Sequence, residues 1–338
     1  MPNYFNFFAR LAVSSLLCLV LAPQSRAGEP IARIEQSGKV LANPDTAYQL
    51  TIHSVAWLSN ITVGKFKIAE LSGLAWDSDE GLLYALSDNG YLLLLKPRFQ
   101  GQQMVSLTLE DARALLDERG RPLKYKPSDS EGLAVINDRN SARGDTELLV
   151  CFERIPRILR FDLHGNMLEK LELPAGLDNI NFYHSENKSL ESVAVHPVYG
   201  VITGTELPLK QESNGQMNIY ALSGKHWSFP PFNPHYGALV DLAIMQDGGV
   251  LALERAYGGL FPIMEITLHH LVLEDESLHH EIIYTFDSRD GLFDENFEGI
   301  TRHEDNAYFM ISDDNNHPLH RTVLAYFSIM PSARETTP

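Results

Sequence analysis

A pair of short apolar segments recurs five times along the chain, and this repeat restricts the possible fold more than any other feature. An acidic residue follows the second segment in every copy and precedes the first segment in four copies, with Ser72 in its place in the first copy. In the last copy, Glu298 precedes the first apolar segment and Asp313 follows the second. The residue after the leading polar residue lies at positions 73, 132, 192, 242 and 299, so the copies are 59, 60, 50 and 57 residues apart. A period of about 40 to 60 residues with several short strands per unit is typical of a β-propeller. We therefore expect an all-β protein with a β-propeller fold.

The number of blades follows from the length of the chain. Further strand candidates lie between the repeats, such as residues 157–163 and 217–222, and would complete four-stranded blades. About 311 residues remain after a predicted leader, and a blade of about 50 residues then predicts six blades, with five or seven as alternatives. Residues 31–69 would supply the degenerate blade and a strand that closes the ring. Residues 110–119, followed by Gly120 and Pro122, form the best helix candidate.

The N-terminus has the pattern of a secretory signal peptide. Arg10 precedes an apolar run at 11–22, and Ser25 and Ala27 place small residues at −3 and −1 of a cleavage site. The run is short for a transmembrane helix, although a membrane anchor is the alternative. The sequence therefore predicts a signal peptide at 1–27, a single propeller domain at 28–338, and a periplasmic or secreted monomer. No other apolar run is long enough to span a membrane after cleavage.

The charge balance excludes one class of partner. The chain carries 44 acidic and 27 basic residues, for a formal net charge of −17. Nucleic-acid binding needs clustered Lys and Arg, so we expect no nucleic-acid partner. An acidic chain suits the binding of cations instead. Only Cys151 remains after the predicted cleavage, so no internal disulfide is expected.

The repeated acidic residues are predicted to meet at one mouth of the propeller channel. The start of one strand and the end of its antiparallel neighbour lie at the same end of the pair. If these pairs are the inner strands of the blades, nine carboxylates converge. The set before the first strand is Glu131, Glu191, Asp241 and Glu298. The set after the second strand is Asp88, Glu153, Glu206, Glu254 and Asp313.

So many carboxylates need a counter-charge, which can be a metal ion, arginines or bound protons. Ligands that are all oxygen favour a hard cation, Ca²⁺ before Mg²⁺. A purely structural role is the alternative, since Glu153-Arg154 and Glu254-Arg255 also suggest ion pairs between blades. The predicted metal ligands are Glu131, Glu191, Glu298, Asp313, Asp88, Glu206 and Glu254.

Candidates for catalysis are fewer. His317 follows the acidic end of the last repeat and is a candidate general acid or base, with a solvated loop histidine as the alternative. Arg255 is a second candidate catalytic residue. The sequence contains no Gly-x-Ser-x-Gly elbow, which disfavours acyl-enzyme chemistry through serine. Water activated by a metal ion is the better enzymatic interpretation.

The repeated motifs resemble a known family. Leu71–Ala75, Ser130–Ala134, Glu191–Ala194, Ala252–Arg255 and the Phe297–Ile300 segment with Ser312–Asn315 are similar to the bacterial esterase-like phytase family, over roughly residues 60–330. The resemblance implies a propeller fold, export and a hydrolase function.

Two further implications come with the propeller relatives. By similarity to β-propeller phytases, which bind Ca²⁺, Arg154, Arg255, Arg302 and Arg321 become possible phosphate contacts. The Glu-Gly-Leu-Ala opening at Glu131 is also similar to gluconolactonase-type propellers, in which one divalent ion polarises a lactone.

Three functions follow from these observations. The first is a Ca²⁺-dependent hydrolase of small phosphate or carboxylic esters, with the ion held by Glu131, Glu191, Glu298 and Asp313. The second is a non-catalytic propeller that binds a ligand or partner. The third is a metal-dependent lactonase. Loss of hydrolysis in a chelator would separate the enzymes from the binding protein.

Overall fold

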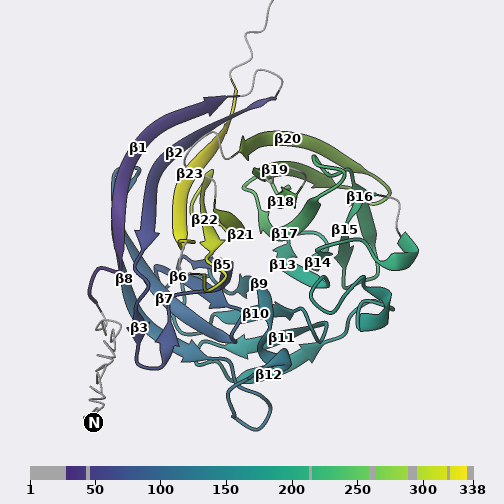
Figure 1. Ribbon diagram of the computed structural model, residues 1–338, viewed down its shortest axis with the longest axis horizontal. Helices are drawn as coiled ribbons and strands as arrows, with labels where there is room; N and C mark the ends of the chain where they lie inside the picture. The colour runs from purple at the N-terminus through teal and green to yellow at the C-terminus, as the bar shows by residue number, and fades with distance from the viewer. Residues whose placement is uncertain are drawn as a thin grey trace, which may run out of the picture.

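The computed structural model describes residues 28–42, 46–212, 215–258, 263–287, 295–317 and 320–332. The predicted signal peptide at 1–27 lies outside these residues. Within the described part, five β-sheets of four or five strands surround a central channel like the blades of a propeller (Figure 1). None of the described helices is long and apolar enough to cross a membrane.

Four blades are antiparallel sheets whose strands follow one another from the channel outward. The first contains β5 (Leu71–Asp77), β6 (Leu82–Ser87), β7 (Tyr91–Gln100) and β8 (Gln103–Ala114). The second contains β9 (Ser130–Ile136), β10 (Glu147–Phe152), β11 (Arg157–Asp162) and β12 (Met167–Leu171). The third contains β13 (Leu190–His196), β14 (Gly200–Thr205), β15 (Met217–Ala221) and β16 (His226–Phe229). The fourth contains β17 (Gly237–Ile244), β18 (Val250–Gly258), β19 (Ile263–Leu273) and β20 (Leu278–Asp287).

The fifth blade joins the two ends of the domain. It contains β21 (Asn296–Arg302), β22 (Ala307–Asp313) and β23 (Val323–Pro331), followed outward by β2 (Tyr48–Leu58) and β1 (Ala32–Ala42). β2 pairs with β23 from Tyr48↔Pro331 to Trp57↔Val323, so the N-terminal segment closes the ring.

The propeller prediction is confirmed, but the expected six blades are wrong and the alternative of five is right. Residues 32–58 extend the last blade instead of building their own, and β3 (Thr62–Val63) pairs only with β4 (Phe66–Lys67). Several outer strands are also long, with 11 residues in β19 and 12 in β8. A blade therefore uses more residues than the estimate of six blades assumed.

The expected helix at 110–119 is also wrong. Its first half belongs to β8, which pairs with β7 along its whole length. Leu107 and Leu109 alternate with more exposed residues and are buried in the core between the first and fifth blades. This burial on a period of two outweighs the local helix propensity of the Glu-Asp-Ala-Arg-Ala run. The described helices are three 3₁₀ turns, η1 (Lys126–Ser128), η2 (Ile180–Phe182) and η3 (Lys210–Glu212).

The innermost strands β5, β9, β13, β17 and β21 pack against one another around the channel. Small residues permit this close approach. A Cβ added at Gly132 would lie 2.6 Å from the Cα of Ser192 on the next blade, and one added at Gly73 would lie 2.7 Å from the carbonyl oxygen of Glu131. The glycines of the repeat are therefore packing residues, and they bring the polar residues beside them to the channel.

Candidate functional site

A β-bulge near the start of every innermost strand builds the site. The strand register shifts at Ser72 in the first blade, at Glu191 in the third and at Glu298 in the fifth. The same shift includes Glu131 in the second blade and Val240 in the fourth. A bulge leaves one residue without a partner in the hydrogen-bond ladder between the strands and changes the direction of its side chain. The five bulged residues are Ser72, Glu131, Glu191, Val240 and Glu298.

The fourth blade differs from the sequence alignment by one residue. Asp241 pairs with Leu253 and occupies the place that Gly299 holds in the fifth blade, so Val240 is the bulged residue. The neighbouring strand shifts with it. Glu254 pairs with Leu239 as Ser312 pairs with Phe297, and Arg255 corresponds to Asp313. Because side chains alternate between the two faces of a strand, a slip of one residue sends them to the opposite face.

The slip moves two predicted members out of the acidic set. Asp241 is fully buried, and its carboxylate accepts hydrogen bonds from the N–H groups of Leu242 (2.8 Å) and Ile300 (2.7 Å). The carboxylate of Glu254 is 1% exposed and is occupied by backbone N–H groups and a histidine. Its partners are Phe232 N (2.7 Å), Asn233 N (2.9 Å) and His269 Nε2 (2.8 Å). We therefore remove Glu254 from the predicted metal ligands.

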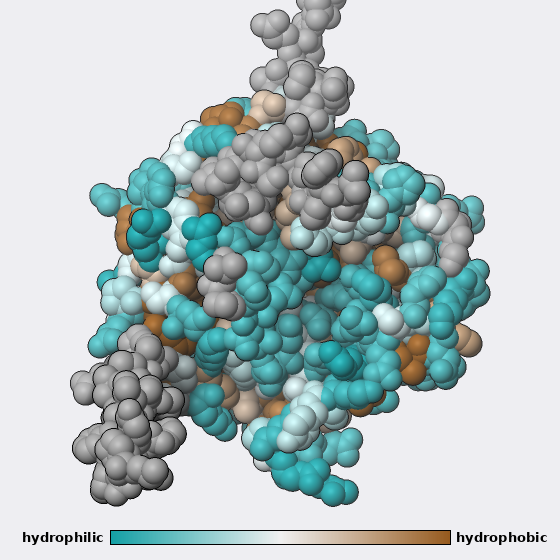
Figure 2. Space-filling model, viewed as in Figure 1, coloured by the Kyte–Doolittle hydropathy of each residue, from teal (hydrophilic) through white to brown (hydrophobic). Residues whose placement is uncertain are grey.

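The remaining ring contains seven carboxylates and one guanidinium. The equivalent positions at the mouth end of the second strand of each blade are held by Asp88, Glu153, Glu206, Arg255 and Asp313. With the bulged Glu131, Glu191 and Glu298 they surround one mouth of the channel. Figure 2 faces this mouth and shows hydrophilic residues gathered around its centre.

Crowding and burial make these carboxylates hard to ionise. Burial raises the pKa of Glu153 to about 8, and repulsion from Glu206 and Asp129 adds to the effect. Burial also raises the pKa of Asp313 to about 8, with Glu298 as the next cause. The pKa values of Glu131, Glu191 and Asp88 are raised well above their ordinary range, first by burial and then by neighbouring carboxylates. The mouth therefore needs protons or a cation at neutral pH.

Two groups of three carboxylates are close enough to share a cation. Oxygens of Asp129, Glu131 and Glu153 lie within 4.8 Å of one another, and so do oxygens of Glu153, Glu191 and Glu206. Glu153 belongs to both groups. Sequence reasoning missed Asp129, which precedes β9 by one residue, and left Glu153 out of the ligand set. The position of Asp129 just before a repeat could have indicated it.

The other side of the mouth holds the remaining predicted ligands, Asp88, Glu298 and Asp313. After the larger effect of burial, Asp313 and Glu298 raise the pKa of Asp88, and Glu298 raises the pKa of Asp313. The Oδ1 atom of Asp88 is buried without a hydrogen-bond partner in the described part of the chain. An unsatisfied buried carboxylate oxygen calls for a bound proton or a cation, so this side of the mouth is not a closed structural network.

Arg255 supplies the main positive charge inside the ring. One of its nitrogens lies 3.2 Å from Glu206 Oε1, and another pairs with Glu298 and donates to Asn296 Oδ1 at 2.9 Å. Lys188 Nζ also contacts Glu206 Oε1, at 3.0 Å. Burial works to lower the pKa of Arg255, but the carboxylates, Glu298 first, overcome this and raise it. Arg255 therefore stays charged and holds two of the acidic residues in place.

A cavity of about 820 Å³ opens beside Arg255 at this mouth. Its walls include Lys188, Glu206, Tyr236 and His320. His317, the predicted candidate for a general acid or base, does not line it. His317 is exposed, and its ring centroid lies 4.8 Å from that of His320. His320 is therefore the histidine that the structure places at the cavity.

The other predicted arginines are spread over the molecule. Arg154 pairs with Asp129 at 2.5 Å and Arg321 pairs with Glu295 at 2.9 Å, both near the acidic mouth. Arg302 ends β21 and lines a separate cavity formed by the opposite ends of the inner strands. Of the four, Arg255 alone reaches into the ring of carboxylates.

Comparison with solved structures gives matches of low identity. A gluconolactonase from Xanthomonas campestris has 12% identity and a TM-score of 0.43, with 90% of this chain and 99% of that chain covered. The β-propeller domain of Cps50 (Swd1) from Myceliophteria thermophila has 10% identity and a TM-score of 0.37, with 89% and 99% covered. Sqt1 from Saccharomyces cerevisiae has 12% identity and a TM-score of 0.35, with 86% and 83% covered.

No curated protein matches the chain. One family model does match, over residues 67–316, and its description is "Esterase-like activity of phytase". The match spans the strands from β5 to β22 and therefore every carboxylate of the acidic mouth. In agreement with the resemblance of its repeated motifs, the chain belongs to the phytase-like family.

Proposed function

We propose that the protein is an exported hydrolase of phosphate or carboxylic esters that uses Ca²⁺ at the acidic mouth. One observation carries the proposal: five carboxylates form two overlapping groups of three within 4.8 Å, and they lie at the mouth where the 820 Å³ cavity opens. Membership in a family described by esterase-like activity supports the reaction class. The proposed ligands are Asp129, Glu131, Glu153, Glu191 and Glu206.

The chemistry of the ligand set favours calcium. Ca²⁺ takes six to eight oxygen ligands in flexible geometry, whereas Mg²⁺ needs a tight octahedron. Glu153, shared by both groups, suits one ion with several carboxylates or two ions that share a ligand. A divalent ion bound here would act as a Lewis acid on an ester carbonyl or phosphoryl oxygen.

The protein's own residues would perform the other steps. Arg255 and Lys188 keep Glu206 at the edge of the cavity and place positive charge where an ester oxygen gains negative charge. Asp313 is in neither group of three, and a pKa of about 8 suits a group that takes up a proton near neutral pH. His320 lines the cavity and is a second candidate for proton transfer.

A non-catalytic ligand-binding propeller is the second candidate. The observation that favours it is that some acidic residues of the mouth already have protein partners, namely Glu206 with Lys188 and Arg255, and Asp129 with Arg154. In that case calcium would act as a structural staple or be absent.

Calcium titration of metal-free protein by calorimetry tests the metal site. We expect saturable binding by the wild type and at least tenfold weaker binding by the Glu131→Gln/Glu191→Gln double variant. Glu172→Gln is the matched control, because Glu172 is an exposed carboxylate after β12. Equal binding by all three proteins would exclude this metal site.

A hydrolysis panel separates the two candidates. Nitrophenyl phosphate, nitrophenyl acetate and a lactone would be assayed with calcium and with a chelator. The hydrolase proposal expects turnover that the chelator abolishes. Calcium binding that raises the melting temperature, with no turnover of any substrate, would instead identify a binding propeller. Export is tested separately by the mass of the mature protein from a host with a periplasm, which should begin at Gly28.

A further inference from the structure

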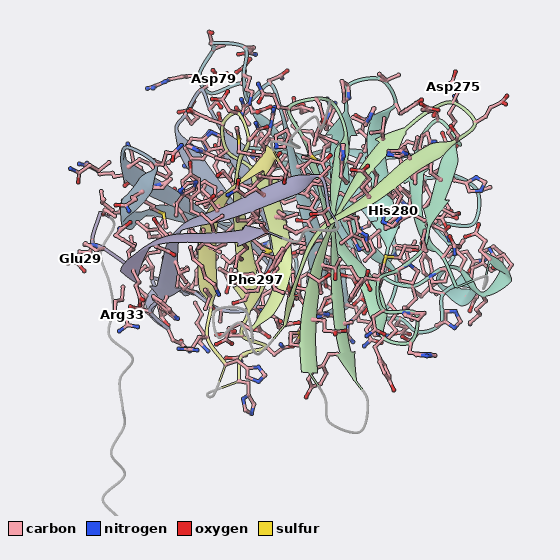
Figure 3. All side chains as sticks on the ribbon, turned by 90° about the horizontal axis from the view of Figure 1, so that it is seen from above. Glu29, Arg33, Asp79, Asp275, His280 and Phe297 are labelled. Carbon is pink, nitrogen blue, oxygen red and sulfur yellow. The ribbon has the colours of Figure 1, made fainter. Side chains whose placement is uncertain are left out.

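The opposite mouth of the channel differs sharply from the acidic one. A cavity of about 480 Å³ lies there, formed by the far ends of all five innermost strands. The charged residues in its wall are Asp138, Arg139 and Arg302. Figure 3 shows the propeller from the side, and Asp79, in the turn that follows β5, lies on this far face. In a chain with a net charge of −17, a cavity with two arginines and one acidic residue is unusual.

Arg139 reaches across this mouth. It follows β9 of the second blade, and its guanidinium donates to the carbonyl oxygen of His303, which follows β21 of the fifth blade. Its Nε also lies 3.4 Å from the carboxylate of its neighbour Asp138. The one acidic residue in the wall therefore already has a cationic partner.

Arg302 has no such partner. Its side chain is half-buried, and no hydrogen bond or ion pair joins it to another residue of the described part of the chain. Burial lowers the pKa of Arg302 and repulsion from Arg139 lowers it further, and these effects outweigh the attraction of Asp138 and Asp305. Leaving a partly desolvated guanidinium beside a like charge is unfavourable unless an anion compensates it.

Other hydrogen-bond donors face the same space. Thr301 and Gln246 line the cavity, and their side chains make no hydrogen bond to another described residue. Each innermost strand is also the edge of its sheet, so backbone N–H groups along its inner edge face the channel. A planar guanidinium matches the oxygens of a carboxylate or phosphate with two parallel hydrogen bonds.

We propose that the far mouth of the channel is an anion-binding site in which Arg302, with Arg139 beside it, holds a small oxyanion such as phosphate or a carboxylate. This site is separate from the acidic mouth, and it does not depend on the hydrolase proposal. It gives the channel a negative and a positive end.

Thermal denaturation of metal-free protein with added anions tests the site. Sodium phosphate and sodium acetate would be compared with sodium chloride at equal ionic strength and pH. We expect a saturable rise in melting temperature with at least one oxyanion, beyond that with chloride. The response to phosphate against acetate identifies which oxyanion the site prefers. Equal effects of all three salts would show screening alone and would overturn the proposal.

Variants locate the effect. Arg302→Gln should raise the anion concentration at the midpoint of the response at least tenfold. Arg302→Lys keeps the charge but loses the two parallel donors of the guanidinium, so it should raise that concentration less. Arg98→Gln is the matched control, because Arg98 is an exposed arginine on the outer strand β7. If Arg302→Gln fails to fold, Arg139→Gln gives the same test. An unchanged midpoint in the folded variants would contradict the site.

Discussion

Replacing Glu153 by glutamine tests the acidic mouth most directly, because Glu153 belongs to both groups of three carboxylates. In the metal-free protein its pKa is about 8, against an ordinary value of 4.5, and its side chain is only 6% exposed. Because the pKa is raised on folding, the folded state holds the proton more tightly than the unfolded state. The contribution of Glu153 to the stability of the wild type should therefore be most favourable below about pH 4.5 and should be lost as the pH rises to about 8.

The size of the effect follows from the two pKa values. Each pKa unit corresponds to about 1.4 kcal/mol, so the interval from 4.5 to about 8 sets an upper limit of roughly 5 kcal/mol. Burial is the main cause of the raised pKa, and relaxation of the site around the charge relieves part of this cost, so we expect on the order of 2 kcal/mol. The amide of the Glu153→Gln variant carries no charge at any pH. The variant should therefore be more stable than the wild type at about pH 8.5 and nearly equal to it at about pH 4.5.

Urea denaturation at the two pH values, in buffer free of divalent ions, measures this difference. Calcium provides the second half of the test, because the substitution removes a shared ligand. Saturating calcium should stabilise the wild type strongly and the variant much less. A stability difference that is the same at both pH values would refute the assignment of a raised pKa to Glu153. Equal stabilisation of both proteins by calcium would remove Glu153 from the proposed ligands.

Three further predictions concern the residues and strands that hold the mouth together. Arg255→Gln leaves Glu298 without its cation and should cost about 3–5 kcal/mol in urea denaturation, more at pH 8 than at pH 5 because the carboxylate is then charged; a loss independent of pH would contradict this. Glu254→Gln weakens the bonds to Phe232 N, Asn233 N and His269, so it should lower stability by about 1–3 kcal/mol without changing calcium affinity in calorimetry. A change in that affinity would return Glu254 to the ligand set. A chain that lacks residues 1–60 loses β1 and β2, which close the ring, and should show no cooperative thermal transition by circular dichroism; a normal transition would mean that the ring closes without them.

The architecture of the blades could be predicted from the order of the residues alone. Five copies of one motif, four of them with acidic residues at both ends, were enough to predict inner strand pairs that bring carboxylates to one mouth. These strand pairs can be predicted because the motif contains two local features. The alternation of apolar residues favours a strand, and the glycine lets the inner strands approach each other closely. Glu131, Glu191 and Glu206 reach the mouth as these features predict.

Contacts between distant parts of the chain set what the local pattern leaves open. In the fourth blade the run Val240-Asp241-Leu242 fits two registers equally well, and in the observed one Asp241 accepts a hydrogen bond from Ile300 N of the neighbouring fifth blade. This shift of one residue puts Arg255 at the position predicted for Glu254, and so it places a cation in the acidic ring. The closure of the fifth blade by β2 is likewise a pairing between the two ends of the domain, as between Tyr48 and Pro331. No local pattern predicts such a pairing, because the sequence of a strand shows that its edge can form hydrogen bonds but not which strand it will pair with.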